Sequence, residues 1–79
     1  MSSPRRLAVP RRVAVSAPDG RPLEVAGQPV DSVRESWLVE DRWWTDRPVG
    51  RRYWEVVTAS GRDEVVFQDL HSGRWWRQR

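Results

Sequence analysis

Residues 36–44 read SWLVEDRWW and hold three of the six tryptophans of this 79-residue chain. The stretch is rich in aromatic and β-branched residues and repeats with a period of two, which is typical of a strand. Side chains of a strand alternate between two faces, so one face carries Trp37, Val39 and Trp43 and the other carries Leu38 and Trp44. The stretch therefore predicts a strand that is apolar on both faces.

Segment 33–44 also has an alternative interpretation as a helix, because Val33, Trp37 and Trp44 fit a helical spacing. Val39, the aromatic residues and the period of two favour the strand. The same arrangement recurs in the doublets Tyr53-Trp54 and Trp75-Trp76, each of which places one ring on each face of a sheet.

Turn residues divide this part of the chain into strands. Pro48 and Gly50 lie in a connector over residues 45–51, and Ser60-Gly61 and Ser72-Gly73 suit tight turns because glycine tolerates positive φ. The predicted strands are 33–44, 53–58, 64–70 and 74–78. Short turns between successive strands predict an antiparallel meander.

An N-terminal hairpin precedes the meander. Residues 12–17 and 23–25 alternate polar with apolar residues on either side of the turn Pro18-Asp19-Gly20, and Gly27-Gln28-Pro29 is expected to be a connector. Residues 1–11 have the composition of a flexible basic tail. The expected organisation is a tail over 1–11 and one small β domain over 12–79.

The register of the second hairpin follows from the turn assigned to it. If Ser60 and Gly61 are the two turn residues, Trp54 lies opposite Phe67 and Val56 lies opposite Val65. The other face then gathers Tyr53, Val57, Val66, Leu70 and Trp75 with the first strand's Trp37, Val39 and Trp43. The predicted fold is all-β: a four-strand meander plus an N-terminal hairpin, curled into a partly closed barrel similar in size to SH3-like folds.

Composition restricts the chemistry. The chain has no cysteine and one histidine, His71, so a disulfide framework and a zinc site are not expected, and no cofactor is expected. No apolar run approaches the roughly 20 residues that span a membrane, and no apolar signal core follows the N-terminal arginines, so we expect a cytoplasmic protein.

The net charge of +3 invites a nucleic-acid interpretation. All 14 basic residues are arginine, and lysine, asparagine and isoleucine are absent, which indicates a G+C-rich coding sequence in which arginine replaces lysine. The excess of arginine over acidic residues is concentrated in residues 1–12. Charge alone therefore favours a weak, nonspecific contact of the tail with nucleic acid.

Aromatic and turn residues carry a family resemblance over about residues 33–79, in the segments 37–44, 47–49, 52–53, 65–69 and 72–79. This pattern resembles a small actinobacterial domain of unknown function. It is also similar to the C-terminal segment of ImuB-type proteins, the Y-family-polymerase-like, catalytically inactive components of bacterial mutagenesis cassettes.

The resemblance implies an accessory role in translesion DNA synthesis, in which such segments contact partner proteins. The sequence lacks the polymerase-like body of the larger proteins. It also shows no clamp-binding pentapeptide, because Gln68-Asp69-Leu70 has no terminal aromatic residue and falls in a predicted strand. The expected partner is a protein of the mutagenesis cassette.

The acidic residues do not indicate an enzyme. They alternate with apolar residues on strands or lie at turns, where arginines are near in sequence, so we expect structural roles and no catalytic residue. The acids considered are Glu40, Asp41, Asp46, Glu55, Asp63 and Glu64.

Two kinds of binding surface remain. A protein-docking surface is predicted from rings with adjacent arginines: Trp43, Trp44, Tyr53, Trp54, Trp75, Trp76, Arg42, Arg52 and Arg74. The alternative is a single-stranded nucleic-acid site, in which bases stack on rings within a basic groove. Its candidate arginines are Arg5, Arg6, Arg11, Arg12, Arg51 and Arg77.

Overall fold

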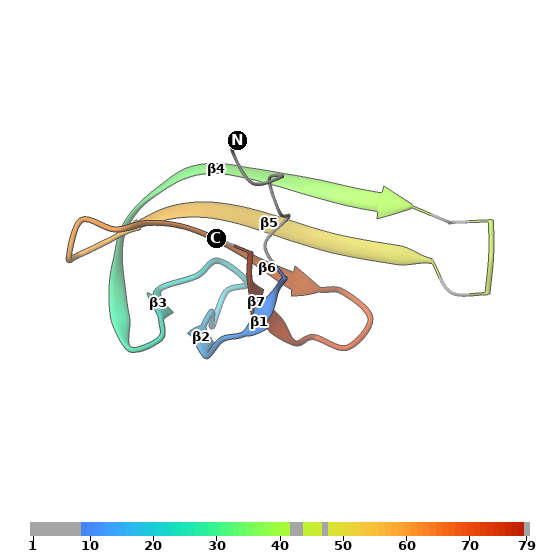
Figure 1. The fold of residues 1–79 in the computed structure, drawn as a ribbon, viewed down its shortest axis with the longest axis horizontal. Helices are drawn as coiled ribbons and strands as arrows, with labels where there is room; N and C mark the ends of the chain where they lie inside the picture. The colour runs from blue at the N-terminus through green and yellow to red at the C-terminus, as the bar shows by residue number, and fades with distance from the viewer. Residues whose placement is uncertain (1–8, 42–43, 47, 79) are drawn as a thin grey trace, which may run out of the picture.

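A computed structural model describes residues 9–41, 44–46 and 48–78, and within these residues it contains strands and turns and no helix. The all-β prediction is confirmed. The strands are β1 (Arg11–Arg12), β2 (Val15–Ser16), β3 (Glu24–Val25), β4 (Gln28–Asp41), β5 (Val49–Thr58), β6 (Asp63–Asp69) and β7 (Trp75–Arg77) (Figure 1).

The described strands form one seven-stranded antiparallel sheet in the order β1-β7-β6-β5-β4-β3-β2. The run β4 to β7 is the predicted meander. β1 and β2 are consecutive in the chain but lie at opposite ends of the sheet. The intervening backbone contacts both ends, since Val13 N donates to Trp75 O at 3.3 Å and Ala14 O accepts from Ala26 N at 2.8 Å. The sheet is therefore curled into a half-barrel.

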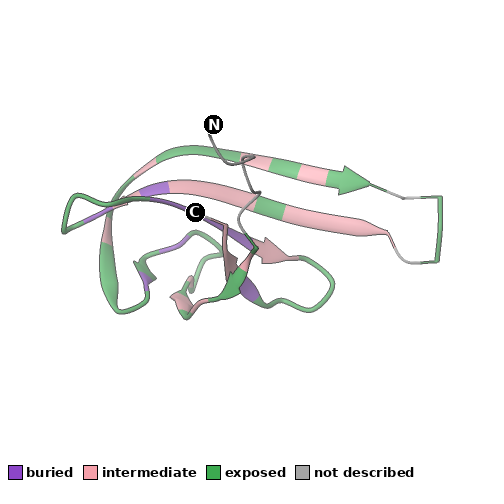
Figure 2. Ribbon diagram, viewed as in Figure 1, coloured by how far each residue is buried: buried purple, intermediate pink, exposed green. Residues whose placement is uncertain are grey.

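The core lies inside this curl. Its buried side chains come from β3, β5, β6 and β7, and partly buried apolar side chains from the N-terminal segment and β4 pack against them. Figure 2 shows buried residues along β6 and toward the end of β5, while β4 is largely exposed. The buried members are Val25, Val56, Val66 and Trp75.

The turn between β5 and β6 has three residues, 59–61. Gly61 N donates to Thr58 O at 2.8 Å, Thr58 N donates to Arg62 O at 2.9 Å, and Gly61 has a φ of 86°. This is a three-residue hairpin loop with glycine in the left-handed position. The two-residue turn expected at Ser60-Gly61 is wrong, and the pairing shifts by one residue.

That shift exchanges the faces of β6. Tyr53 pairs with Phe67, Trp54 pairs with Val66, and Val56 pairs with Glu64, so the expected Trp54–Phe67 and Val56–Val65 pairs are wrong. A one-residue slip turns every side chain of a strand to the other face. Val66 and Trp75, expected beside Tyr53, instead lie with Trp54 on the core face.

A second turn lengthens β4. Ala26 and Gly27 both have positive φ, 51° and 80°, and they join Val25 directly to its pairing partner Gln28. Two positive φ values match the twist of a tight hairpin. Gln28 and Pro29, expected to be a connector, therefore begin β4. β5 likewise begins at Val49, inside the connector predicted over 45–51.

Irregular pairing lets β4 serve two neighbours. The register between β4 and β5 shifts between Val30 and Ser32 and again between Val33 and Glu35. Bulges bend a strand and increase its twist. The start of β4 therefore curves toward β3, and its regular second half continues along β5 as an extended arm (Figure 1). At the other end of the sheet, Arg11 of β1 pairs with Arg77 of β7, so the prediction that Arg11 belongs to the tail is wrong.

We predict that Ala26→Asn stabilises the protein. A left-handed conformation costs a residue with a Cβ about 1–2 kcal/mol, and asparagine tolerates it better, so we expect a gain of about 0.5–1 kcal/mol in the free energy of unfolding by urea denaturation. Ala59→Asn is the matched control in an exposed turn without positive φ, and its effect should stay within about 0.5 kcal/mol. A loss of stability in Ala26→Asn alone would contradict this account of the turn.

Candidate docking surface

The register aligns four aromatic residues across the face turned away from the core. Trp37 of β4 lies opposite Tyr53 of β5, Tyr53 opposite Phe67 of β6, and Phe67 opposite Trp76 of β7. The rings of Trp37 and Tyr53 stack with centroids 5.3 Å apart and planes 3° apart. Tyr53 and Phe67 are tilted, with centroids 4.9 Å apart. We call Trp37, Tyr53, Phe67 and Trp76 the aromatic row.

Arginines cover the β7 end of the aromatic row. Arg12, opposite Trp76 in β1, places its guanidinium carbon 5.4 Å from the centre of the Trp76 ring. Arg51 lies 4.7 Å from the Phe67 ring and donates from Nη1 to the Tyr53 hydroxyl at 3.3 Å. Such cation–π contacts shield the rings, and Phe67 is only 2% exposed. This end is closed by the chain's own cations.

We call the β4 end of the aromatic row, where Trp37 lies, its open end, because no strand among the described residues pairs beyond it. β3 pairs only with Gln28 and Pro29 of β4, so no described strand lies beyond Trp37. One ring face of Trp37 stacks on Tyr53, and the residue is partly buried. Around Trp37, β4 carries the exposed acids Glu35, Glu40 and Asp41. The open end is therefore aromatic and acidic.

Two of the hollows in the described structure lie on opposite faces of the sheet. One of about 230 Å³ is lined by Pro10, Arg51, Phe67, Asp69 and Trp76. A larger groove of about 420 Å³ opens on the other face, where the β4–β5 arm passes the turn before β3. Its lining is Asp19, Gly20, Arg21, Leu38, Arg52, Trp54, Gln68 and Leu70. Among the described residues, no three His, Cys, Asp or Glu side chains gather as a metal site would require.

Asp69 shapes the turn between β6 and β7. Its Oδ1 accepts hydrogen bonds from the backbone N–H groups of His71 at 2.8 Å and Ser72 at 3.2 Å. Burial acts to raise the pKa of the Asp69 carboxyl, but these hydrogen bonds and the charges of His71 and Arg51 outweigh it, and the pKa falls below 3.8. The ionised form therefore stabilises the turn, in which His71 is exposed.

The structure separates the predicted docking rings. Trp75 is 8% exposed within the core, so the expectation that it contacts a partner does not fit its position. Trp54 packs against the core, and its Nε1 is buried without a hydrogen-bond partner. Tyr53 and Trp76 belong to the aromatic row. Trp44 is 67% exposed at the end of the β4–β5 arm.

The predicted arginines are also dispersed. Arg52 and Arg74 are exposed, Arg52 beside the larger groove and Arg74 before β7. Arg11 lies in β1, and Arg77 Nε lies 2.7 Å from Oε1 of the buried Glu64, close enough for an ion pair although the two atoms are not aligned as a hydrogen bond. The candidates outside the described residues are Arg5, Arg6, Arg42 and Trp43.

Sequence reasoning missed Phe67 and Trp37 as members of one row. The sequence places Trp37 on the face of Tyr53, but the expected two-residue turn puts Phe67 on the other face, opposite Trp54. The available signal is Gly61 as the third residue of a loop 59–61, a position that commonly takes the left-handed conformation. That assignment brings Phe67 opposite Tyr53.

Comparison with known proteins gave no relative: no family model matches the chain, and neither a curated protein nor a solved structure matches it significantly. In the part of the chain that the structure describes, no helix is long and apolar enough to cross a membrane.

We predict that Phe67→Ala severely destabilises the protein. Loss of a buried aromatic ring costs about 3–5 kcal/mol, and it also removes a neighbour from Tyr53. Thermal unfolding followed by near-ultraviolet circular dichroism should show a much lower midpoint or no cooperative transition. Leu70→Ala is the control, since Leu70 is 50% exposed and should change the stability little. A thermal midpoint of Phe67→Ala close to that of the parent would show that the Phe67 ring does not stabilise the fold.

We predict that Asp69 contributes acid-sensitive stability. Because its folded pKa lies below the ordinary value of 3.8, the contribution is complete above that value and is lost as pH falls through the folded pKa. Unfolding midpoints of the parent and Asp69→Asn should therefore differ at neutral pH and converge in acid. A difference that stays constant with pH would show that the charge of Asp69 does not stabilise the turn.

Proposed function

We propose that this chain is a non-enzymatic protein-interaction module that docks on a protein of the DNA-damage-tolerance machinery through the open end of the aromatic row. The supporting observation is the position of Trp37: its ring stacks on Tyr53 at a strand edge that pairs with no further strand in the described part of the sheet. Apolar side chains continue beside it: Val39 is partly buried, and Leu38, on the opposite face of β4, is 45% exposed. Partly exposed aromatic and aliphatic groups of this kind anchor protein interfaces.

The charge around Trp37 favours a protein over a nucleic acid. Glu35 and Asp41 lie on the same face of β4 as Trp37, and carboxylates repel the phosphates that would accompany a stacked base. In the described part of the chain, the guanidinium groups of Arg12 and Arg51 lie over the Trp76 and Phe67 rings of the aromatic row. The accessible ring and the cations are thus at different ends of the row.

The translesion setting is supported by the resemblance of residues 33–79 to the C-terminal segment of ImuB-type proteins. We therefore propose a cassette protein of that kind as the partner, in the cytoplasm. A second candidate function, binding of single-stranded nucleic acid, is favoured by the 67% exposure of Trp44, which offers a ring for base stacking.

Site-specific photocrosslinking to a purified ImuB-type protein tests the docking proposal. A photoreactive amino acid replaces Leu38, which follows Trp37 along the β4 edge and is 45% exposed on the opposite face of the strand. In a matched control it replaces Leu23, which is 53% exposed near β3. We expect a crosslink from position 38 and little from position 23. Equal yields from both positions, or none from either, would overturn the proposal.

The nucleic-acid alternative makes an opposite prediction about salt. Affinity for single-stranded DNA that depends on phosphate contacts falls with a log–log slope of about −0.7 per contact. By fluorescence anisotropy, we expect weak binding that is lost at physiological salt and on removal of residues 1–10, which leaves β1 in place. Micromolar binding that survives both changes and is lost in folded Trp44→Ala would replace the docking proposal with the nucleic-acid one.

A further inference from the structure

The outer edge of β4 offers a regular strand for pairing. After the register shift between Val33 and Glu35, every residue from Glu35 to Asp41 pairs in sequence with β5, from Glu55 back to Val49. On its other side, this stretch is next to no strand in the described part of the sheet. A regular edge presents backbone donors and acceptors that an added strand satisfies.

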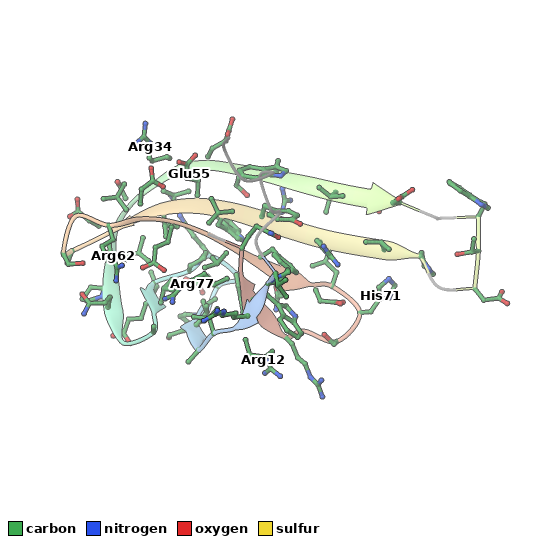
Figure 3. The ribbon with its side chains drawn as sticks, in the orientation of Figure 1. Arg12, Arg34, Glu55, Arg62, His71 and Arg77 are labelled. Carbon is green, nitrogen blue, oxygen red and sulfur yellow. The ribbon has the colours of Figure 1, made fainter. Side chains whose placement is uncertain are left out.

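The opposite edge of the same sheet shows how this protein completes an edge. β1, Arg11–Arg12, is a short basic strand that adds antiparallel to β7. Its Arg12 lies directly opposite Trp76, the last ring of the aromatic row, and its guanidinium lies over that ring at 5.4 Å. Figure 3 labels Arg12 beside β1 and Arg34 beside β4, on opposite sides of the ribbon. Trp37 is the equivalent last ring at the β4 edge.

Charge identifies the kind of strand that fits this edge. Residues 35–41 contain Glu35, Glu40 and Asp41 and no basic residue. A second copy fits poorly, because antiparallel pairing of the whole stretch about Leu38 places Glu35 opposite Asp41 twice, and like charges directly opposite destabilise a sheet. A basic strand places cations opposite the same carboxylates.

We propose that the β4 edge binds an extended basic segment of a partner protein, which adds antiparallel along residues 35–41 and places an arginine over the ring of Trp37. This contact of an arginine with Trp37 is equivalent to the cation–π contact of Arg12 with Trp76 at the β7 edge. Carboxylates on both faces of β4, Glu35 on one and Glu40 on the other, bind further cations of the segment. This inference rests on the proposed function and names the chemistry of its partner.

The probe is a capped seven-residue peptide, Arg-Arg-Val-Val-Arg-Thr-Arg, whose fifth residue lies opposite Trp37. A control peptide has the same sequence with alternate backbone amides N-methylated on the side that faces β4, which keeps the charge and blocks pairing. Titrations by nuclear magnetic resonance on the full chain should show shifts confined to residues 35–41 and slower amide exchange there. The methylated peptide should bind at least tenfold more weakly.

Variants locate the contact. Trp37→Leu keeps an apolar strand residue and removes the ring, so the affinity for the peptide should fall about threefold. Glu35→Lys should weaken binding about fivefold, whereas Glu24→Lys, a matched exposed change in β3, should leave it unchanged. Unfolding midpoints confirm that each variant is folded.

Equal binding of both peptides would reduce the effect to nonspecific charge attraction and overturn the inference, as would absence of binding at millimolar peptide. Analytical ultracentrifugation tests for a dimer that pairs through β4. A dimer that is lost in Glu35→Pro but not in Glu24→Pro would show that the edge pairs with a second copy of the chain, which would overturn the inference. If the peptide does not bind while the ImuB-type protein crosslinks from position 38, the docking proposal stands, but docking does not occur by addition of a basic strand to β4. If the peptide binds but the crosslink does not form, addition of a basic strand to β4 is supported and the ImuB-type protein is rejected as the partner.

Discussion

The three-residue turn at residues 59–61 is the constraint on which the arrangement of side chains depends. It fixes the pairing of β5 with β6, and because side chains alternate along a strand, it also fixes which residues of β6 meet which face. With this pairing, Val66 joins Val56 in the core and Phe67 joins Tyr53 in the aromatic row. A loop one residue shorter would place Phe67 on the same face as Trp54.

The two faces of the sheet are then covered by different means. The N-terminal strands fold over the core face, where Val25 is completely buried among side chains of β5, β6 and β7. The aromatic row is covered by arginine side chains at one end, with the long stems and guanidinium groups of Arg12 and Arg51 over its rings. A small chain without cysteine thus uses both faces of its sheet for packing.

The two long edges of the sheet differ in the same way. The β7 edge is occupied by β1, whereas the second half of β4 has no described neighbour on its outer side. Bulges at the start of β4 and acidic residues along its regular half are devices that limit indiscriminate pairing of a free edge. The same charges that discourage self-association make the edge selective for a basic strand, which links its protection to the proposed docking.

The sequence by itself determined the all-β class, the order of the meander and the hairpin around Pro18-Asp19-Gly20. These follow from local properties: alternation, β-branched and aromatic content, and the turn preferences of proline and glycine. Only the tertiary structure decided the faces, because whether residues 59–61 form a two- or three-residue loop is a small local difference that moves Phe67 from one side of the sheet to the other. The tertiary structure also decided that Trp75 is core and that Trp37 ends the aromatic row at an open edge. Both outcomes depend on where the N-terminal strands dock. Strands 11–12 and 15–16 are too short for their sequence to assign them to opposite ends of a sheet.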